Sequence, residues 1–240
     1  MKRAFAFLTI FGGAAVPAPT ALAWFPVVGV ALGAGVGTLW WAAGHWWPPF
    51  VAGVIAVMVD LVATGLLHVD GLADTGDGLL APMSREQRLR VMADPAVGAF
   101  GLVVVVIVLT LRIAAVTSLA PSVLALAGLW CASRTVLIVI IRTTPYARPE
   151  GIAQSFLAAT STRRESVTLG LSIALGVATA AVLLLIDASV RGLVALVIEF
   201  VTMALVVWWA RRRLGGFTGD VLGAALVLGE TLGLVALVTR

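Results

Sequence analysis

The most chemically informative part of this sequence is a group of acidic side chains that follows an apolar stretch. Asp70, Asp74 and Asp77 stand at positions i, i+4 and i+7, which share one face of a helix. Like charges on one face repel each other, and the repulsion grows where lipid lowers the dielectric constant. A divalent cation reverses that interaction, and Mg²⁺ prefers a few carboxylates together with water and substrate phosphates. The pattern indicates either a magnesium site or a polar loop that ends in solvated acids.

A second line of polar side chains precedes these acids. Asp60, Thr64 and His68 stand at i, i+4 and i+8 and run along the end of the apolar stretch. An ionisable residue inside a membrane span is by default a candidate functional residue, which favours the metal site over the solvated loop. Two roles fit His68: it orients a substrate hydroxyl or accepts its proton, or it is a structural, hydrogen-bonded histidine. Three neighbouring glycines would let a phosphate approach the backbone closely: Gly71, Gly76 and Gly78.

The composition places the chain in a membrane. Of its 240 residues, 61% are hydrophobic and 12% are charged, whereas about 25% are charged in an average soluble domain. We expect one integral-membrane domain over residues 1–240. The single cysteine, Cys131, forms no intrachain disulfide and no thiolate zinc site. A net charge of +4 is ordinary for membrane loops and does not indicate nucleic-acid binding.

The elements that must position the polar residues are helices. Each apolar run is close to the ~20 residues that cross the hydrocarbon core of a bilayer. We therefore expect an all-α, polytopic membrane bundle of about seven transmembrane helices, at residues 26–43, 48–67, 98–118, 121–141, 166–186, 190–209 and 220–238. The sequence shows no internal repeat and no sign of a span that is broken near the middle of the membrane.

Two further segments are expected at the membrane surface. Residues 2–23 resemble a signal peptide, with Lys2 and Arg3 before an apolar run, but a chain that is otherwise embedded needs no cleaved leader. We expect this segment to be retained as an interfacial or re-entrant element. Ser84 and Gln87 match a capping box, which predicts an interfacial amphipathic helix at about 85–93.

Arginines set the expected orientation. They concentrate in the connections at 68–97, 142–165 and 210–219, whereas the opposite side receives only Arg191, Arg240 and, as an assignment left open, Arg112. This asymmetry places the three arginine-rich connections in the cytoplasm. The first also carries the acids, and the other two combine arginine with glycine. Arginine forks, glycine amides and carboxylate-held metal all bind phosphates, so we expect a phosphate site that faces the cytoplasm.

One arginine lies inside a predicted span. A charged side chain at the centre of a span costs about 2.5–3.5 kcal/mol on insertion scales, so Arg134 should face the bundle interior and meet an anionic partner. It forms either a structural ion pair, with Glu199 or Asp60, or a phosphate contact in a cavity open to the cytoplasm. Glu230 lies about 15 Å along a helix from Asp220, and we expect it to be structural.

Six motifs along the chain carry a resemblance to a known family. They are F-P-x-x-G from Phe25, T-G-x-x-H-x-D-G-x-A-D-x-x-D-G from Thr64, M-x-D-x-x-x-G-x-F-G from Met92, S-R at Ser133, P-Y-A-R with a following glycine from Pro145, and G-G-x-T-G-D-x-x-G-A from Gly215. In this order and spacing they resemble the cobalamin synthase family, also called adenosylcobinamide-GDP ribazoletransferase. The chain departs from the family at Ile10 to Gly12, where R-I-P is usual, at Asp60, where Glu is common, and at Val227, where an acid is frequent.

The resemblance implies a reaction of cobalamin biosynthesis. In this family a ribose hydroxyl of α-ribazole, or of its 5′-phosphate, attacks the diphosphate of adenosylcobinamide-GDP, and GMP leaves. Mg²⁺ is the implied cofactor. Its expected ligands are Asp70, Asp74 and Asp77, completed by Asp94 or Asp220. The expected catalytic residues are Asp60, His68 and Asp74, and the expected substrate-binding residues are Thr64, Arg134, Arg142, Tyr146 and Arg148.

Partners and alternatives follow from the same features. We expect an enzyme of a prokaryotic inner membrane that contacts lipid and small-molecule substrates, and a homo-oligomer is left open. One alternative is another membrane phosphotransferase of the CDP-alcohol type, although its D-x-x-D-G-x-x-A-R motif is absent. A second is a cation-coupled transporter that uses Asp60, Arg134 and Glu199 as a relay. That alternative requires inverted repeats and broken spans and leaves the charged connections unexplained.

Overall fold

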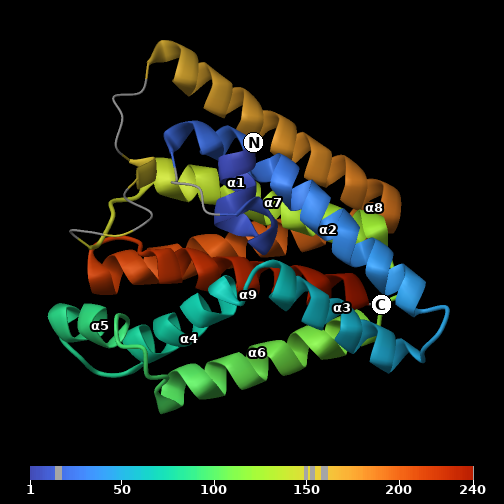
Figure 1. Ribbon diagram of the computed structural model, residues 1–240, viewed down its shortest axis with the longest axis horizontal. Helices are drawn as coiled ribbons and strands as arrows, with labels where there is room; N and C mark the ends of the chain where they lie inside the picture. The colour runs from blue at the N-terminus through green and yellow to red at the C-terminus, as the bar shows by residue number, and fades with distance from the viewer. Residues whose placement is uncertain (14–17, 149–150, 152–154, 158–161, 240) are drawn as a thin grey trace.

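The computed structural model of the protein describes residues 1–13, 18–148, 151, 155–157 and 162–239. This part of the chain is helical and contains no strand, which confirms the expected all-α class. Its elements are α1 Lys2–Leu8, η1 Ile10–Gly12, η2 Pro19–Trp24, α2 Phe25–Ala43, α3 Pro49–Ala63, α4 Leu67–Leu80, α5 Arg85–Val91, α6 Ala99–Thr117, α7 Val123–Thr143, α8 Arg163–Leu214 and α9 Gly219–Val238 (Figure 1).

The bundle is built around α7 and α9. In their most apolar stretches 83% of the residues of α7 and 78% of those of α9 are buried, against 28% for α6 and 17% for α8. Figure 1 shows α2 and the first part of α8 on the α7 side, and α4 and α6 on the α9 side. The outer helices α6 and α8 therefore turn long apolar faces outward, as an integral membrane protein must.

The number of spans differs from the expected seven. Five described helices are long and apolar enough to cross a membrane, or six when α3 and α4 are taken as one broken span, so the count of seven is not confirmed. The 52-residue helix α8 is counted once there, although Ser189 interrupts it with φ 52° and ψ −131°. A Cβ added at Gly192 would lie 2.0 Å from the Leu184 carbonyl oxygen, whereas eight residues of straight helix separate two groups by about 12 Å. The chain thus turns back at Ser189, between the predicted spans 166–186 and 190–209.

A sharp bend replaces the straight span that was predicted at 48–67. Helices α3 and α4 meet at 87°. Gly65 and Leu66 both adopt φ 61° at the bend, and the Thr64 hydroxyl donates a hydrogen bond to the Asp60 carbonyl at 2.9 Å. The prediction that no span is broken is therefore wrong. The acids lie on helix α4, so the alternative of a polar loop is wrong as well.

The amino-terminal segment does not cross the bundle as a helix of its own. Helix α1 has only 7 residues, and η2 leads directly into α2. The Phe7 ring stacks on Phe25, with centroids 5.9 Å apart, and meets Phe156 edge-on at 4.8 Å. Aromatic packing thus fixes α1 against the start of α2. Residues 14–17 of the predicted segment 2–23 lie outside the described residues.

Helix α5 is joined to the protein through its arginines. The predicted capping box of Ser84 and Gln87 is confirmed. Arg88 is buried and donates to the Gly78 carbonyl at 2.6 Å, at the end of α4. Arg85 donates to the Leu214 carbonyl at 2.7 Å, at the end of α8. These bonds satisfy carbonyl groups that a helix end leaves free, and they tie α5 to α4 and α8.

Helix α4 crosses α9 at two glycines. A Cβ added at Gly71 would lie 2.7 Å from the Asp220 carbonyl oxygen, and one added at Gly223 would lie 3.1 Å from the His68 Cα. Only glycine allows the two backbones to approach this closely. The crossing sets His68 and the acids of α4 directly against the beginning of α9.

Replacement of Gly71 by alanine tests this crossing. The added methyl group has no space against the backbone at Asp220, so we expect Gly71→Ala to lower the free energy of unfolding by about 1–3 kcal/mol. Denaturant unfolding in mild detergent measures the change. Gly35 is the matched control, since its added Cβ meets no atom within 4 Å. Gly35→Ala should be neutral or slightly stabilising, and equal stability of the two variants would contradict the close crossing.

Candidate active site

The three arginine-rich connections meet at one end of the bundle. Tyr146 and Phe217 form an isolated parallel bridge. The Ala147 N–H donates to the Phe217 carbonyl at 2.8 Å, and the Phe217 N–H donates to the Pro145 carbonyl at 2.9 Å. With the anchors of α5, these bonds join the connections after α4, α7 and α8, which lie far apart in the sequence.

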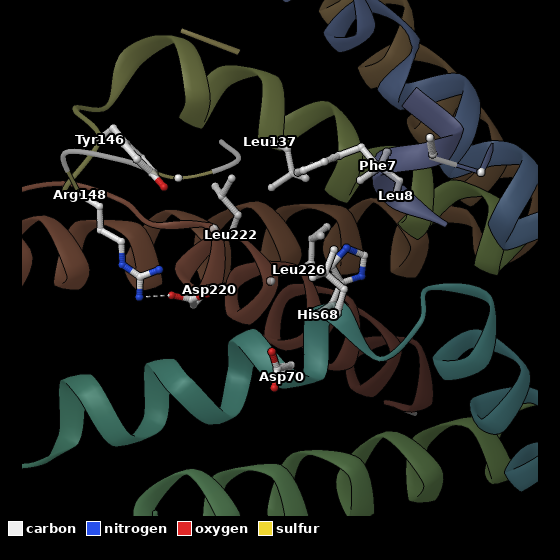
Figure 2. A pocket seen from close by; sticks show the side chains of 16 residues that line it. Phe7, Leu8, His68, Asp70, Leu137, Tyr146, Arg148, Asp220, Leu222 and Leu226 are labelled. Atoms are coloured by element: carbon white, nitrogen blue, oxygen red, sulfur yellow. Dashed lines mark ion pairs between the residues drawn. The ribbon is translucent and has the colours of Figure 1, made fainter. Parts of the chain in front are cut away.

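A cavity of about 590 Å³ opens beside this junction. Five of the predicted site residues line it: His68, Asp70, Tyr146, Arg148 and Asp220. The rest of the wall is mainly apolar, with Phe7, Leu8, Leu137, Leu222 and Leu226. Figure 2 shows Tyr146, Arg148 and Asp220 at one side and Phe7 with Leu8 at the other. The cavity therefore suits a ligand with a charged part and a large apolar part.

Acidic charge exceeds basic charge at the polar side. Arg148 pairs with Asp220 at 2.8 Å and donates to the Met92 carbonyl at 2.9 Å. Asp220 and then Asp70 are the strongest like charges acting on the half-buried Asp74. Three carboxyl groups therefore lie near one guanidinium at this side of the protein.

The donor set fits magnesium chemically but is not a finished cage. Among the described residues, no group of three or more His, Cys, Asp or Glu side chains is arranged to hold a metal ion. Mg²⁺ usually needs only one or two carboxylates, with waters and substrate phosphates completing its shell. Asp70 on α4 and Asp220 on α9 line the cavity, and Asp74 on α4 does not line it but lies within electrostatic range of both, so the three can supply such carboxylates. These three are the residues that would hold the ion.

Two predicted metal ligands have other contacts. Asp77 is buried and accepts hydrogen bonds from the backbone N–H groups of Gly98 at 2.7 Å and Gly101 at 2.9 Å. Both of its oxygens therefore cap the amino-terminal end of α6. Asp94 is exposed and accepts a bond from the Ala96 N–H at 2.9 Å. Neither residue lines the cavity.

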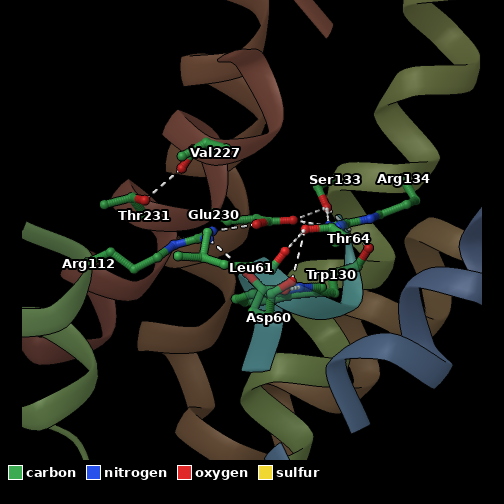
Figure 3. A network of polar contacts seen from close by, with 10 residues as sticks. All are labelled: Asp60, Leu61, Thr64, Arg112, Trp130, Ser133, Arg134, Val227, Glu230 and Thr231. Carbon is green, nitrogen blue, oxygen red and sulfur yellow. Dashed lines mark hydrogen bonds and ion pairs between the residues drawn. The ribbon is translucent and has the colours of Figure 1, made fainter. Parts of the chain in front are cut away.

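A buried group of four charges links the helices beneath the cavity (Figure 3). Arg112 on α6 pairs with Asp60 on α3 at 2.9 Å and also with Glu230 on α9. Glu230 pairs in turn with Arg134 on α7. The Trp130 indole N–H donates to the second oxygen of Asp60 at 2.8 Å. We call Asp60, Arg112, Arg134 and Glu230 the buried charge network.

The network changes the roles expected for several residues. Arg134 has an anionic partner, as predicted, but the partner is Glu230 rather than Glu199 or Asp60. Arg112 is 2% exposed, so its expected place near the opposite surface is wrong. The sequence signal for Arg112 was available, since it is the single charge in an apolar run. None of Asp60, Thr64 or Arg134 lines the 590 Å³ cavity.

Tyr146 and Arg142 line different cavities. Burial raises the pKa of the Tyr146 hydroxyl, which therefore stays protonated and able to donate a hydrogen bond at the cavity wall. Arg142 is exposed in the last turn of α7 and lines a separate cavity of about 200 Å³. The structure thus does not bring Arg142 together with the other predicted substrate-binding residues.

Comparison with known proteins gives one consistent result. The family model described as cobalamin-5-phosphate synthase matches residues 1–238. A Citrobacter koseri protein is 35% identical over 217 residues, which cover 89% of this chain and 85% of the relative. Relatives from Escherichia coli and Shigella flexneri are each 36% identical over the same shares. All three are named adenosylcobinamide-GDP ribazoletransferase. No solved structure matches the chain.

The buried charge network predicts an asymmetry between two buried glutamates. Glu230→Gln removes the charge that faces Arg112 and Arg134, so we expect a loss of about 3–5 kcal/mol in the free energy of unfolding. Glu199 is equally buried, but within the described residues neither of its carboxylate oxygens has a hydrogen-bond partner. Glu199→Gln should therefore cost much less. Unfolding in detergent compares the two variants, and similar losses would show that the network does not carry this stability.

Proposed function

This chain belongs to the cobalamin-5-phosphate synthase family, and from this premise we propose that the 590 Å³ cavity is its active site. The chain is a transferase that joins adenosylcobinamide-GDP with ribazole in the last steps of cobalamin synthesis. Membership in this family excludes the phosphotransferase of the CDP-alcohol type and the cation-coupled transporter. The active site and the role of each residue in it remain to be assigned.

One observation carries the assignment. The cavity gathers His68 and Asp70 from α4, Tyr146 and Arg148 from the connection after α7, and Asp220 from the start of α9. Each of these elements contains one of the motifs shared with the family. Since the three segments are distant in the sequence, their convergence on a single cavity supports a common function.

The two sides of the cavity suit the two kinds of substrate surface. A diphosphate is anionic and belongs beside Arg148, whose guanidinium can donate to phosphate oxygens. The aromatic base of ribazole is largely apolar and belongs against Phe7, Leu137 and Leu226. Ribazole and its 5′-phosphate both fit this division.

We infer that Asp70, Asp74 and Asp220 hold Mg²⁺ when the substrate binds. The ion would supply charge neutralisation for the diphosphate oxygens. Arg148 is held by Asp220 at 2.8 Å, and this pairing directs its guanidinium into the cavity beside the carboxylates. The proposed site therefore combines the positive guanidinium of Arg148 with three carboxylates that attract Mg²⁺.

His68 is the proton acceptor in our proposal. A ribose hydroxyl oxygen forms the new bond to the phosphorus on the aminopropanol side, the bond from that phosphorus to the GMP oxygen breaks, and the hydroxyl proton passes to His68. Both oxygens of Asp60, the alternative base, are engaged by Arg112 and Trp130. His68 lines the cavity and Asp60 does not. Positioning of this kind is the main requirement of phosphoryl transfer.

We also propose that the cavity faces the cytoplasm of a prokaryotic cell and that the helices lie in its inner membrane. The arginines of the three joined connections support this orientation under the positive-inside rule. The nucleotide substrate and the released GMP would then be exchanged with the cytoplasm directly.

Release of GMP tests the reaction. The purified protein in mild detergent receives adenosylcobinamide-GDP with α-ribazole or its 5′-phosphate, in the presence of magnesium or of EDTA. We expect GMP release that requires magnesium and one of the two ribazole substrates. Release that continues in EDTA would contradict the magnesium proposal, and no release from a folded sample would contradict the site.

Asp74→Asn tests the carboxylates separately. The substitution keeps the size of the side chain and removes a charge next to Asp70 and Asp220, so we expect GMP release to fall at least a hundredfold while the protein stays folded. Asp187, an exposed acid that accepts a bond from Ser122, is the control. Asp187→Asn should keep its activity. An active Asp74→Asn protein would remove Asp74 from the proposed site.

A further inference from the structure

A second, smaller site lies on the outer side of the bundle, away from the proposed active site. Its polar part is the 200 Å³ cavity that contains Arg142 from the end of α7 and Arg164 from the start of α8. Its apolar part is a groove of about 320 Å³ between α2 and α8. Ala23, Trp24 and Thr168 line both, so the cavity and the groove adjoin each other. We call the combined feature the α2–α8 groove.

The polar end carries a positive charge that is free to bind an anion. Arg142 and Arg164 are exposed, and neither forms an ion pair with any residue in the described part of the chain. Glu165 also lines this cavity, and one of its oxygens accepts a bond from the Thr162 N–H at 3.0 Å in the capping box of α8. Two guanidinium groups against one engaged carboxylate favour a phosphate group.

The apolar end has a defined floor and an open side. Gly176 packs so closely on α7 that an added Cβ would lie 2.3 Å from the Thr135 hydroxyl, and the Ser172 hydroxyl donates to the Ala23 carbonyl at 2.8 Å. These contacts fix α8 against its neighbours. Leu171 and Leu175 line the groove and are more than half exposed, at 59% and 58%. They therefore border the groove while facing the surrounding lipid.

The dimensions match one leaflet of a bilayer. From Thr168 to Thr179, the groove-lining part of α8 rises roughly 16 Å at 1.5 Å per residue. Half of the hydrocarbon core is about 15 Å thick. The two arginines lie at one end of this length, among the arginine-rich connections, and the exposed Trp24 lies beside them at the level where interfacial tryptophans are common.

We propose that the α2–α8 groove binds one anionic phospholipid, with its phosphate on Arg142 and Arg164 and an acyl chain along the groove. Phosphatidylglycerol has this chemistry, since it carries a negative headgroup and no ammonium group to be repelled by the arginines. The site also gives Arg142 a function outside the main cavity. It stands independently of the reaction assigned to the active site.

Lipid binding can be measured on the whole protein by native mass spectrometry. The delipidated protein receives equal amounts of phosphatidylglycerol and phosphatidylethanolamine, and we expect it to retain phosphatidylglycerol preferentially. The double variant Arg142→Gln, Arg164→Gln should lose this preference, with affinity falling at least about tenfold because two charge-assisted hydrogen bonds are removed. Arg163→Gln is the control, since Arg163 is an exposed neighbour that does not line the cavity.

Two further arms separate a lipid from other anions. Leu175→Trp narrows the groove but leaves both arginines in place, so it should weaken phosphatidylglycerol and leave the protein folded. Excess inorganic phosphate should not displace the lipid. The proposal is overturned if phosphate competes as well as phosphatidylglycerol does, if α-ribazole 5′-phosphate displaces the lipid, or if Arg163→Gln has the same effect as the double variant.

Discussion

The interaction on which the bundle depends is the pairing of four charges in its interior. Asp60, Arg112, Arg134 and Glu230 come from α3, α6, α7 and α9, and together they are neutral. Burying a single unpaired charge in a membrane is unfavourable, and each residue of the network offsets that free energy by pairing with a residue of opposite charge. Because a pair forms only when its two helices are in register, the network specifies how these four helices stand relative to one another.

This constraint extends to the proposed active site through α3. Asp60 is held by Arg112 and Trp130 four residues before the bend, and the Thr64 hydroxyl continues the bonding at the bend itself. Helix α4 begins immediately beyond it. Its position is then completed at the other end by Arg88, which caps Gly78. The helix that carries His68 and the acids is thus fixed at both ends and crosses α9 between them.

The sequence was sufficient for the local features and for the family. Helical spacing placed Asp70 and Asp74 on one face, the capping box of α5 was visible as Ser84 and Gln87, and the motifs identified the reaction. The distribution of arginines also predicted that three distant connections share one side. The structure joins two of them through Tyr146 and Phe217 and the third through Arg85 of α5.

Sequence periodicity could not predict which polar residues share a site. Asp60 and His68 stand on one helical line in the sequence, but the 87° bend at Gly65 and Leu66 sends one into the buried charge network and the other into the cavity. The bend depends on two residues with positive φ, and a leucine in that conformation has no sequence signature. The sequence likewise groups Asp77 with the other acids. In the structure its carboxylate accepts hydrogen bonds from N–H groups at the start of α6, and only tertiary packing brings α6 to this position.

The two charge groups of this protein differ in a way that matches their work. The buried charge network is balanced and none of its four residues lines the cavity, so it holds helices together without offering a free charge to a ligand. The group beside the cavity is acidic, since Asp70, Asp74 and Asp220 lie near a single lining arginine, Arg148, within the described residues. In our proposal, the repulsion among these acids would be relieved by the cation that binds together with the diphosphate. The buried charge network thus stabilises the bundle, and this stability offsets the repulsion among the acids at the proposed active site.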